Sequence, residues 1–147
     1  PNKYFDVADK NGNFPVLKCG STQFSCSFRT GEIYLNAAEA AVHLNKLSEA
    51  RGRLLKLIEN RYTPEGYTLK KNEIEAMSQE ALLAEIQEER TKELAFEGHR
   101  WFDLRRTTRP RIEKVLNGQA YLLEQDDSRY TLRIPQSAIA ANPGLLN

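Results

Sequence analysis

The chain has 147 residues, of which 40% are hydrophobic, 28% charged and 9% aromatic, a composition typical of one globular domain and unlike that of disordered chains. Its 21 lysines and arginines oppose 20 acidic residues, and the net charge of +1 excludes a global field that would favour nucleic acid or an anionic membrane as the main partner. No apolar run approaches the roughly 20 residues that a membrane-spanning helix needs.

Both ends of the chain lie in loop-like sequence, and neither an initiator Met nor a signal-peptide pattern begins it. We therefore expect any targeting segment to lie outside this chain, which we interpret as part of a longer protein. Residues 1–28 are predicted to be irregular. They contain Cys19 and Cys26, whose spacing and number do not match a zinc site. Two separate thiols and a short-loop disulfide both remain open for this pair.

A helix hairpin is predicted over residues 29–61. In its first half, small and aliphatic residues recur at spacings of three and four, and we expect them to face a neighbouring helix: Ile33, Ala37, Ala40, Ala41 and Leu44. A second helical pattern follows after a short connection, so the two helices are expected to be antiparallel. Residues 62–66 contain a proline and a glycine, and a loop is expected to follow the hairpin.

A long kinked helix is predicted over residues 78–107, with Ser78 as its N-cap. Gly98 weakens or bends it, so that one kinked helix or two helices in tandem would result. Residues 120–135 are predicted to form a short β-hairpin, with strands at 120–123 and 130–134. Residues 136–147 are predicted to be an extended tail.

Charged residues in the long helix continue a stripe that is apolar one and two turns earlier. In a helix, steps of three, four and three would place four of them on one face: Arg90, Glu93, Glu97 and Arg100. Charges on such a stripe are usually paired and hydrogen-bonded, or belong to a ligand site.

Catalytic and metal sites are disfavoured in this segment. Glu93 and Glu97 would suit acid–base catalysis as a carboxylate pair, but both have arginines within a helical turn. His99 and Asp103 have the spacing of a metal-binding pair, but zinc needs a third ligand and the other histidine, His43, lies on a different helix. We therefore expect no catalytic residue, no metal and no cofactor.

A basic segment, residues 101–114, follows the acidic residues of 71–100. We interpret it as an internal electrostatic match rather than a phosphate groove, and expect no nucleic-acid partner. Aromatic rings are candidate platforms for sugars. Trp101, the sole tryptophan, lies in an apolar pattern and is expected in the core, which leaves Tyr62 and Tyr67, in the predicted loop, as candidate ligand contacts.

Three motifs form the most specific signal in the sequence. Residues 89–106 read E-R-T-K-E-L-A-F-E-G-H-R-W-F-D-L-R-R, residues 29–40 read R-T-G-E-I-Y-L-N-A-A-E-A, and residues 134–143 begin I-P-Q-S-A-I and end N-P. In this order they resemble the signatures of the SusD/RagB family, outer-membrane lipoproteins of Bacteroidetes. The chain departs from that pattern at Ala138, where an acid is usual, and at Gly31, where alanine is commoner.

The resemblance implies a mainly α fold of tetratricopeptide-like helix hairpins, with a small β-hairpin and extended loops near the C-terminus. Residues 1–147 would then be a single unit, the C-terminal part of a SusD-like domain. The function implied is non-catalytic binding of a glycan or other nutrient at the outer cell surface, and its delivery to a SusC-like, TonB-dependent outer-membrane transporter. The protein would be a cell-surface lipoprotein, held to the outer membrane only by a lipid anchor outside this chain.

The resemblance also suggests a structural role for the charged residues of the motifs. We expect a buried ion network that fixes the packing of helices, formed by Arg29, Glu39, Arg90, Glu93, Glu97, Arg100 and Asp103. A helix-repeat protein-interaction module without sugar binding is the alternative function, suggested by the alanine-rich hairpin. A hydrolase that uses Glu93 or Glu97 is a third.

Overall fold

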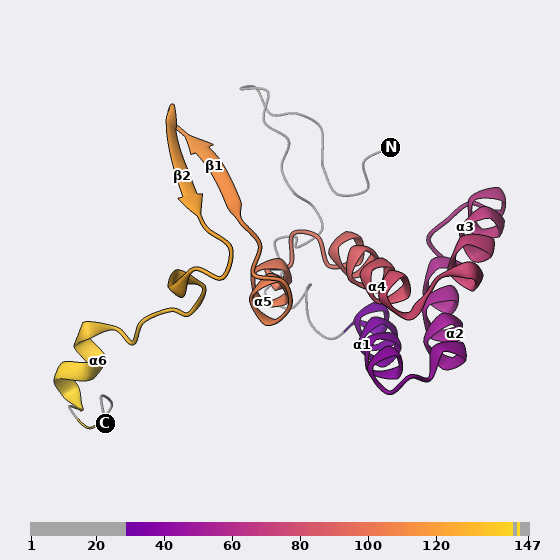
Figure 1. The fold of residues 1–147 in the computed structure, drawn as a ribbon, viewed down its shortest axis with the longest axis horizontal. Helices are drawn as coiled ribbons and strands as arrows, with labels where there is room; N and C mark the ends of the chain where they lie inside the picture. Colours follow the sequence, from indigo (N-terminus) through magenta and orange to yellow (C-terminus); the bar gives the residue numbers. More distant parts are fainter. Residues whose placement is uncertain (1–28, 143, 145–147) are drawn as a thin grey trace. The chain divides into compact units, whose positions relative to one another are not determined.

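A computed structural model of the chain describes residues 29–142 and residue 144 (Figure 1). In chain order it contains α1 (Thr30–His43), α2 (Leu47–Ile58), α3 (Pro64–Ala76), α4 (Gln79–Glu93), α5 (His99–Arg106), β1 (Ile112–Leu116), β2 (Gln119–Leu123), a 3-10 turn η1 (Ser128–Tyr130) and α6 (Gln136–Ala141). The predicted fold class, mainly α with helix hairpins and a small β-hairpin, is confirmed. The predicted irregular segment with Cys19 and Cys26, and the end of the predicted tail, lie outside the described residues.

The chain divides into two compact units between Arg100 and Trp101, whereas the sequence is interpreted as a single unit. The described part of the first unit contains α1 to α4. The second contains most of α5, the β-hairpin, η1 and α6. In the part of the chain that the structure describes, no helix is both long enough and apolar enough to cross a membrane.

Four helices enclose the core of the first unit. The predicted hairpin of α1 and α2 is present, α4 packs against α1, and α3 packs against α2 (Figure 1). Aliphatic side chains from all four helices are fully buried where they meet: Leu35, Ala38, Val42, Ala50, Leu54, Ile58, Ile74, Leu82 and Ile86. Burial of these side chains supplies the main driving force for folding this unit.

The face of α1 that enters the core differs in part from the predicted one, of which Ala41 is buried. Ile33 and Leu44 are 61% and 67% exposed, whereas Leu35, Ala38 and Val42 are buried. Both sides of α1 carry small and aliphatic residues at helical spacing, so periodicity alone does not decide which side is buried.

Helix α3 occupies residues that the sequence pattern predicts to be a loop. Thr63 is its N-cap, and the Thr63 Oγ1 accepts a hydrogen bond from the Gly66 backbone N–H at 3.2 Å. Pro64 takes the first helical position, where a missing N–H leaves no hydrogen bond unmade. The predicted loop is therefore wrong because the proline that ends one helical pattern also begins the next helix.

The side chain of Arg51 joins α2 to the end of α3. It donates from Nε to the Ile74 carbonyl at 3.1 Å and from Nη2 to the Met77 carbonyl at 2.7 Å. These carbonyls lie at the C-terminus of α3, where helical partners are missing and a cation is favoured. On the other side, Lys70 of α3 forms an ion pair with Glu85 of α4 at 2.9 Å.

The predicted long helix over residues 78–107 is two helices in tandem. Ser78 caps α4 as predicted, accepting a hydrogen bond from the Ala81 backbone N–H at 3.3 Å. The helical path ends after Glu93 because Phe96 and Gly98 have φ angles of +67° and +81°, which a right-handed helix does not accommodate.

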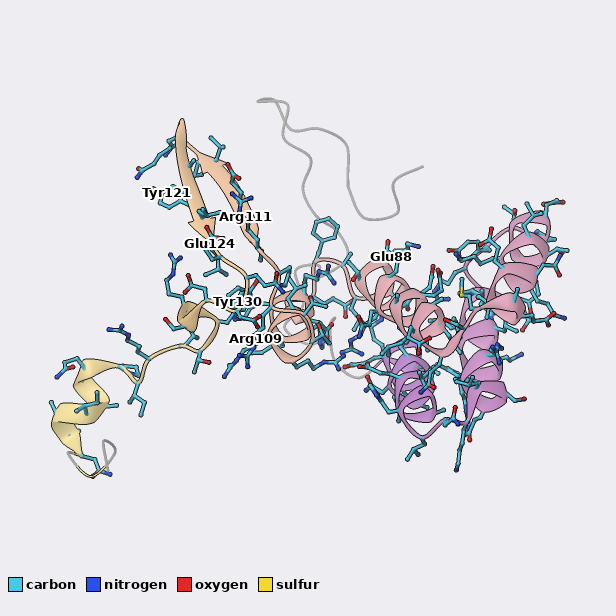
Figure 2. All side chains as sticks on the ribbon, in the orientation of Figure 1. Glu88, Arg109, Arg111, Tyr121, Glu124 and Tyr130 are labelled. Atoms are coloured by element: carbon cyan, nitrogen blue, oxygen red, sulfur yellow. The ribbon has the colours of Figure 1, made fainter. Side chains whose placement is uncertain are left out.

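The β-hairpin lies at residues 112–123 instead of 120–135. Its strands are antiparallel, and the Asn117-Gly118 loop between them has positive φ at both positions, the conformation that a two-residue hairpin turn requires. An ion pair between Arg111 and Glu124, at 3.6 Å, closes the open end of the hairpin (Figure 2). The predicted strand over residues 130–134 is wrong because the Asn-Gly turn pairs β2 with the segment before it.

The predicted extended tail is also wrong over residues 136–141, which form the short helix α6. Pro135 stands just before its first turn, where a fixed φ and a missing N–H suit a helix start, and alanines follow it.

Candidate functional site

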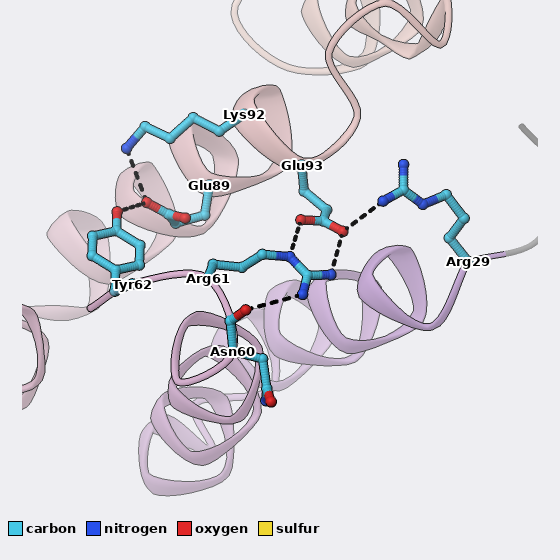
Figure 3. Close-up of a pocket in the computed structure, with 7 residues that line it drawn as sticks. All are labelled: Arg29, Asn60, Arg61, Tyr62, Glu89, Lys92 and Glu93. Carbon is cyan, nitrogen blue, oxygen red and sulfur yellow. Dashed lines mark hydrogen bonds and ion pairs between the residues drawn. The ribbon is translucent and has the colours of Figure 1, made fainter. Parts of the chain in front are cut away.

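The carboxylate of Glu93, buried at the end of α4, binds two arginines from distant parts of the chain (Figure 3). Arg61, just after α2, donates from Nε to Oε2 and from Nη2 to Oε1, both at 2.8 Å. Arg29, just before α1, donates from Nη2 to Oε1 at 3.0 Å. The Arg61 contact is bidentate, the strongest geometry for a guanidinium and a carboxylate.

The space that this carboxylate occupies depends on Gly31 of α1. A Cβ atom at position 31 would lie 2.5 Å from Oε1 and 2.9 Å from Cδ of Glu93, closer than non-bonded atoms approach. A Cβ atom at position 31 would therefore require the Glu93 carboxylate to move. The cost in helix propensity is offset by room for a paired, buried charge.

Arg29 also forms an ion pair with Glu97, whose side chain is only 2% exposed. Glu97 lies in the break between α4 and α5, so this contact does not follow from the helical spacing of Glu93 and Glu97. The backbone turn at Phe96 allows Glu97 to contact the residue that begins α1. We call Arg29, Arg61, Glu93 and Glu97 the Glu93 cluster.

A second group surrounds the buried carboxylate of Glu89, one turn earlier on α4. Its Oε1 accepts hydrogen bonds from the Tyr62 hydroxyl at 2.7 Å and from Lys92 Nζ at 2.9 Å. Burial raises the pKa of Tyr62, and the hydrogen bond to Glu89 and its negative charge raise it further. The pKa of Lys92 is also raised: burial, the largest single effect, lowers it, but the hydrogen bond and charge of Glu89 outweigh that effect.

The two groups line one open pocket of about 520 Å³ (Figure 3). Its lining consists of Arg29, Asn60, Arg61, Tyr62, Glu89, Lys92 and Glu93. Both carboxylates in the lining already accept hydrogen bonds from cations, an arrangement typical of ion pairs that join helices.

Three residues of the predicted network meet at Glu93. The structure brings Arg29, Glu93 and Glu97 together. Arg90, on α4, donates to Asn36 Oδ1 at 2.7 Å and to Glu32 Oε1 at 3.3 Å, and so joins α4 to α1.

Three further residues of the predicted network have the following places. Glu39 is buried on α1. Arg100 donates to Thr91 Oγ1 at 2.7 Å. Within α5, Asp103 forms an ion pair with Arg106 at 3.0 Å.

The aromatic and histidine candidates have defined places as well. Tyr62 lies in the turn before α3 and Tyr67 within α3, and both are half-buried against the core rather than exposed in a loop. Trp101 is half-buried in the second unit. His99 Nδ1 lies 3.9 Å from Glu32, and no group of three or more metal-ligating side chains is placed to hold a metal ion among the described residues.

Sequence patterns miss Arg61, which lies 32 positions from Glu93 along the chain. Helical periodicity relates residues a few positions apart, so it carries no information on this pairing. The partners of Tyr62 and Arg90 were missed for the same reason.

Comparison with known proteins decides the family. A model described as the SusD family matches residues 2–147. The chain belongs to the SusD family. No curated protein matches it significantly.

Two SusD-family motifs of the sequence meet in the Glu93 cluster. The motif at residues 29–40 contributes Arg29 and Gly31, and the motif at residues 89–106 contributes Glu93 and Glu97. Arg61 comes from outside both motifs.

Gly31→Ala is expected to lower the free energy of unfolding by about 1 to 2 kcal/mol, because the new Cβ overpacks against the Glu93 carboxylate. Gly52→Ala is the matched control. Gly52 lies in α2 and a Cβ there meets no atom within 4 Å, so this change should raise stability by about 0.5 to 1 kcal/mol. Urea unfolding of both variants measures the difference, and stabilisation by Gly31→Ala would contradict the close contact.

Tyr62 is expected to ionise later than an ordinary tyrosine as pH rises. Because its folded pKa is raised above 10.0, the stability that its hydroxyl contributes is fully present below pH 10.0 and is lost as pH rises through the folded value. Ultraviolet absorbance of tyrosinate measures this titration. Tyr62→Phe should remove part of the late phase, which is the rise in absorbance that occurs above pH 10.0. Burial also raises the pKa of Tyr130, so a smaller late phase should remain. If Tyr62→Phe instead removed absorbance that develops at or below pH 10.0, the result would contradict the contact between Tyr62 and Glu89.

Proposed function

We propose that this protein binds a glycan or another nutrient at the outer cell surface without catalysing a reaction on it. Membership of the SusD family over residues 2–147 is the observation that carries the proposal. Members of this family are binding proteins rather than enzymes. The geometry of the pocket agrees with that, since its carboxylates are engaged by arginine, lysine and tyrosine.

The Glu93 cluster has a structural role in this proposal. It joins the segment before α1, the segment after α2 and the end of α4. A buried carboxylate is tolerated only when cations and hydrogen-bond donors surround it, and removal of one partner from a buried pair costs about 3 to 5 kcal/mol. In this proposal the Glu93 cluster fixes the arrangement of the helices, and the nutrient is bound elsewhere on the protein.

The finer features of the proposal concern the partner and the place of action. We propose delivery of the bound nutrient to a SusC-like, TonB-dependent transporter in the outer membrane, since the family is generally associated with such transporters. The protein would be a cell-surface lipoprotein whose lipid anchor lies outside this chain, as is typical of the family.

One observation favours the alternative of a protein-interaction module without sugar binding. Ile33 on α1 and Leu44, the residue just after α1, are exposed, and a partner helix would bury them. This alternative predicts capture of the transporter with no affinity for any saccharide.

Isothermal titration of the full-length protein against neutral and acidic oligosaccharides and peptides tests the proposed function. The expected result is saturable binding of at least one saccharide, with no release of reducing ends during prolonged incubation. Binding of no compound would overturn the proposal. Hydrolysis that is abolished by Glu97→Gln in a folded variant would establish the hydrolase instead.

A further inference from the structure

The second unit contains a pocket that differs in chemistry from the one around Glu93. It has a volume of about 320 Å³, within the usual range of small-ligand pockets. Aromatic, aliphatic and basic side chains line it, among them Trp101, Ile112, Lys114, Tyr121, Leu123 and Arg129. Among the described residues, no acidic side chain lines it.

Strand register places four of these residues on one face of the hairpin. Ile112 pairs with Leu123, and Lys114 pairs with Tyr121. Directly opposed residues of antiparallel strands point to the same side, and residues two apart along a strand share that side. Tyr121 projects from β2 (Figure 2), so a phenol ring and an ammonium group stand side by side on this face.

The indole of Trp101 packs on one side against Tyr130. It stacks on the ring of Tyr130, with 5.1 Å between ring centroids and an angle of 10° between the planes. Tyr130 is fully buried and donates its hydroxyl hydrogen bond to the Pro110 carbonyl. A stacked ring on a buried support is a rigid flat surface, which suits the C–H face of a sugar ring.

Lys114 carries a positive charge on the face of the hairpin that lines this pocket. Among the described residues its Nζ has no hydrogen-bond or ion-pair partner. Glu113, its neighbour, lies on the opposite face of β1 by strand alternation and pairs with Arg111 at 3.0 Å.

Arg129 is positioned by contacts that leave part of its guanidinium available. It donates from Nε and Nη2 to Asp127 at 2.9 and 2.6 Å and from Nη2 to the Leu122 carbonyl at 2.9 Å. Hydrogen bonds from Arg129 hold the pKa of Asp127 at about 2, so this anchor stays ionised at ordinary pH. Nη1 of Arg129 donates to no atom of the described residues.

We propose that this pocket binds an acidic saccharide, with the sugar ring against Trp101 and Tyr121 and its carboxylate or sulfate at Lys114 and Arg129. The inference rests on the proposed function and specifies the class of ligand. A neutral sugar would leave the ammonium of Lys114 without a counter-charge near the ring. The ring of an acidic sugar can pack against the flat apolar surface of Trp101. Its charged group, which extends from the edge of the ring, can then pair with Lys114.

Isothermal titration with trigalacturonate and with a chondroitin sulfate disaccharide tests this, using the full-length protein. The wild type should bind at least one of them more tightly than neutral galactotriose. Lys114→Gln should weaken that binding about tenfold or more, and added salt should weaken it in the wild type more than in the variant. Tyr121→Ala should weaken both acidic and neutral ligands.

Lys46→Gln is the matched control, since Lys46 is exposed in the turn between α1 and α2 in the other unit; it should bind as the wild type does. Equal affinity of Lys114→Gln and the wild type, or equal binding of trigalacturonate and its methyl ester, would overturn the inference. Binding of neutral glycans but of no acidic one would overturn this inference and leave the proposed function intact. Absence of all saccharide binding overturns the inference, and absence of binding to every compound, peptides included, overturns the proposed function as well. Tighter binding of a glutamate tripeptide than of either acidic saccharide overturns the inference and assigns the pocket to peptides.

Discussion

The buried carboxylate of Glu93 sets the constraint on which the arrangement of the first unit depends. A charge in this position is stable only with its counter-charges in place, and these come from Arg61 after α2 and Arg29 before α1. Gly31 leaves the space that the carboxylate fills. The ends of three helices are thereby coupled at one point, in addition to the aliphatic core that packs these helices together.

Local patterns in the sequence predict much of the fold, and they are wrong where two patterns compete. The α1–α2 hairpin and the Ser78 cap follow from spacing and capping chemistry. The buried side of α1 does not, because Ile33 and Leu35 lie on two comparably apolar sides. Proline at position 64 both ends one element and begins another, and the Asn117-Gly118 turn is a stronger hairpin signal than the apolar run at residues 130–134.

The candidate sites are less predictable because they depend on contacts between distant segments. Arg29, Glu93 and Glu97 stand out from the motifs, but Arg61 is joined to them only by the tertiary fold. In the second unit, the pairing of Lys114 with Tyr121 follows only once the strand register is known, and the support of Trp101 by Tyr130 needs the position of η1. The near-zero net charge of the chain likewise gives no sign of the ion cluster in one unit, or of Lys114, which has no ion-pair partner among the described residues of the other.

A double-mutant cycle between Arg61 and Glu93 measures how strongly this contact couples the helix ends, with Arg61→Ala, Glu93→Ala and the double variant unfolded in urea. We expect an interaction energy of about 1.5 kcal/mol or more, since the contact is bidentate although Arg61 is 45% exposed. The exposed pair Glu49 and Arg53 provides the reference for a surface contact. An interaction energy between Arg61 and Glu93 as small as that reference, below about 0.5 kcal/mol, would contradict the account.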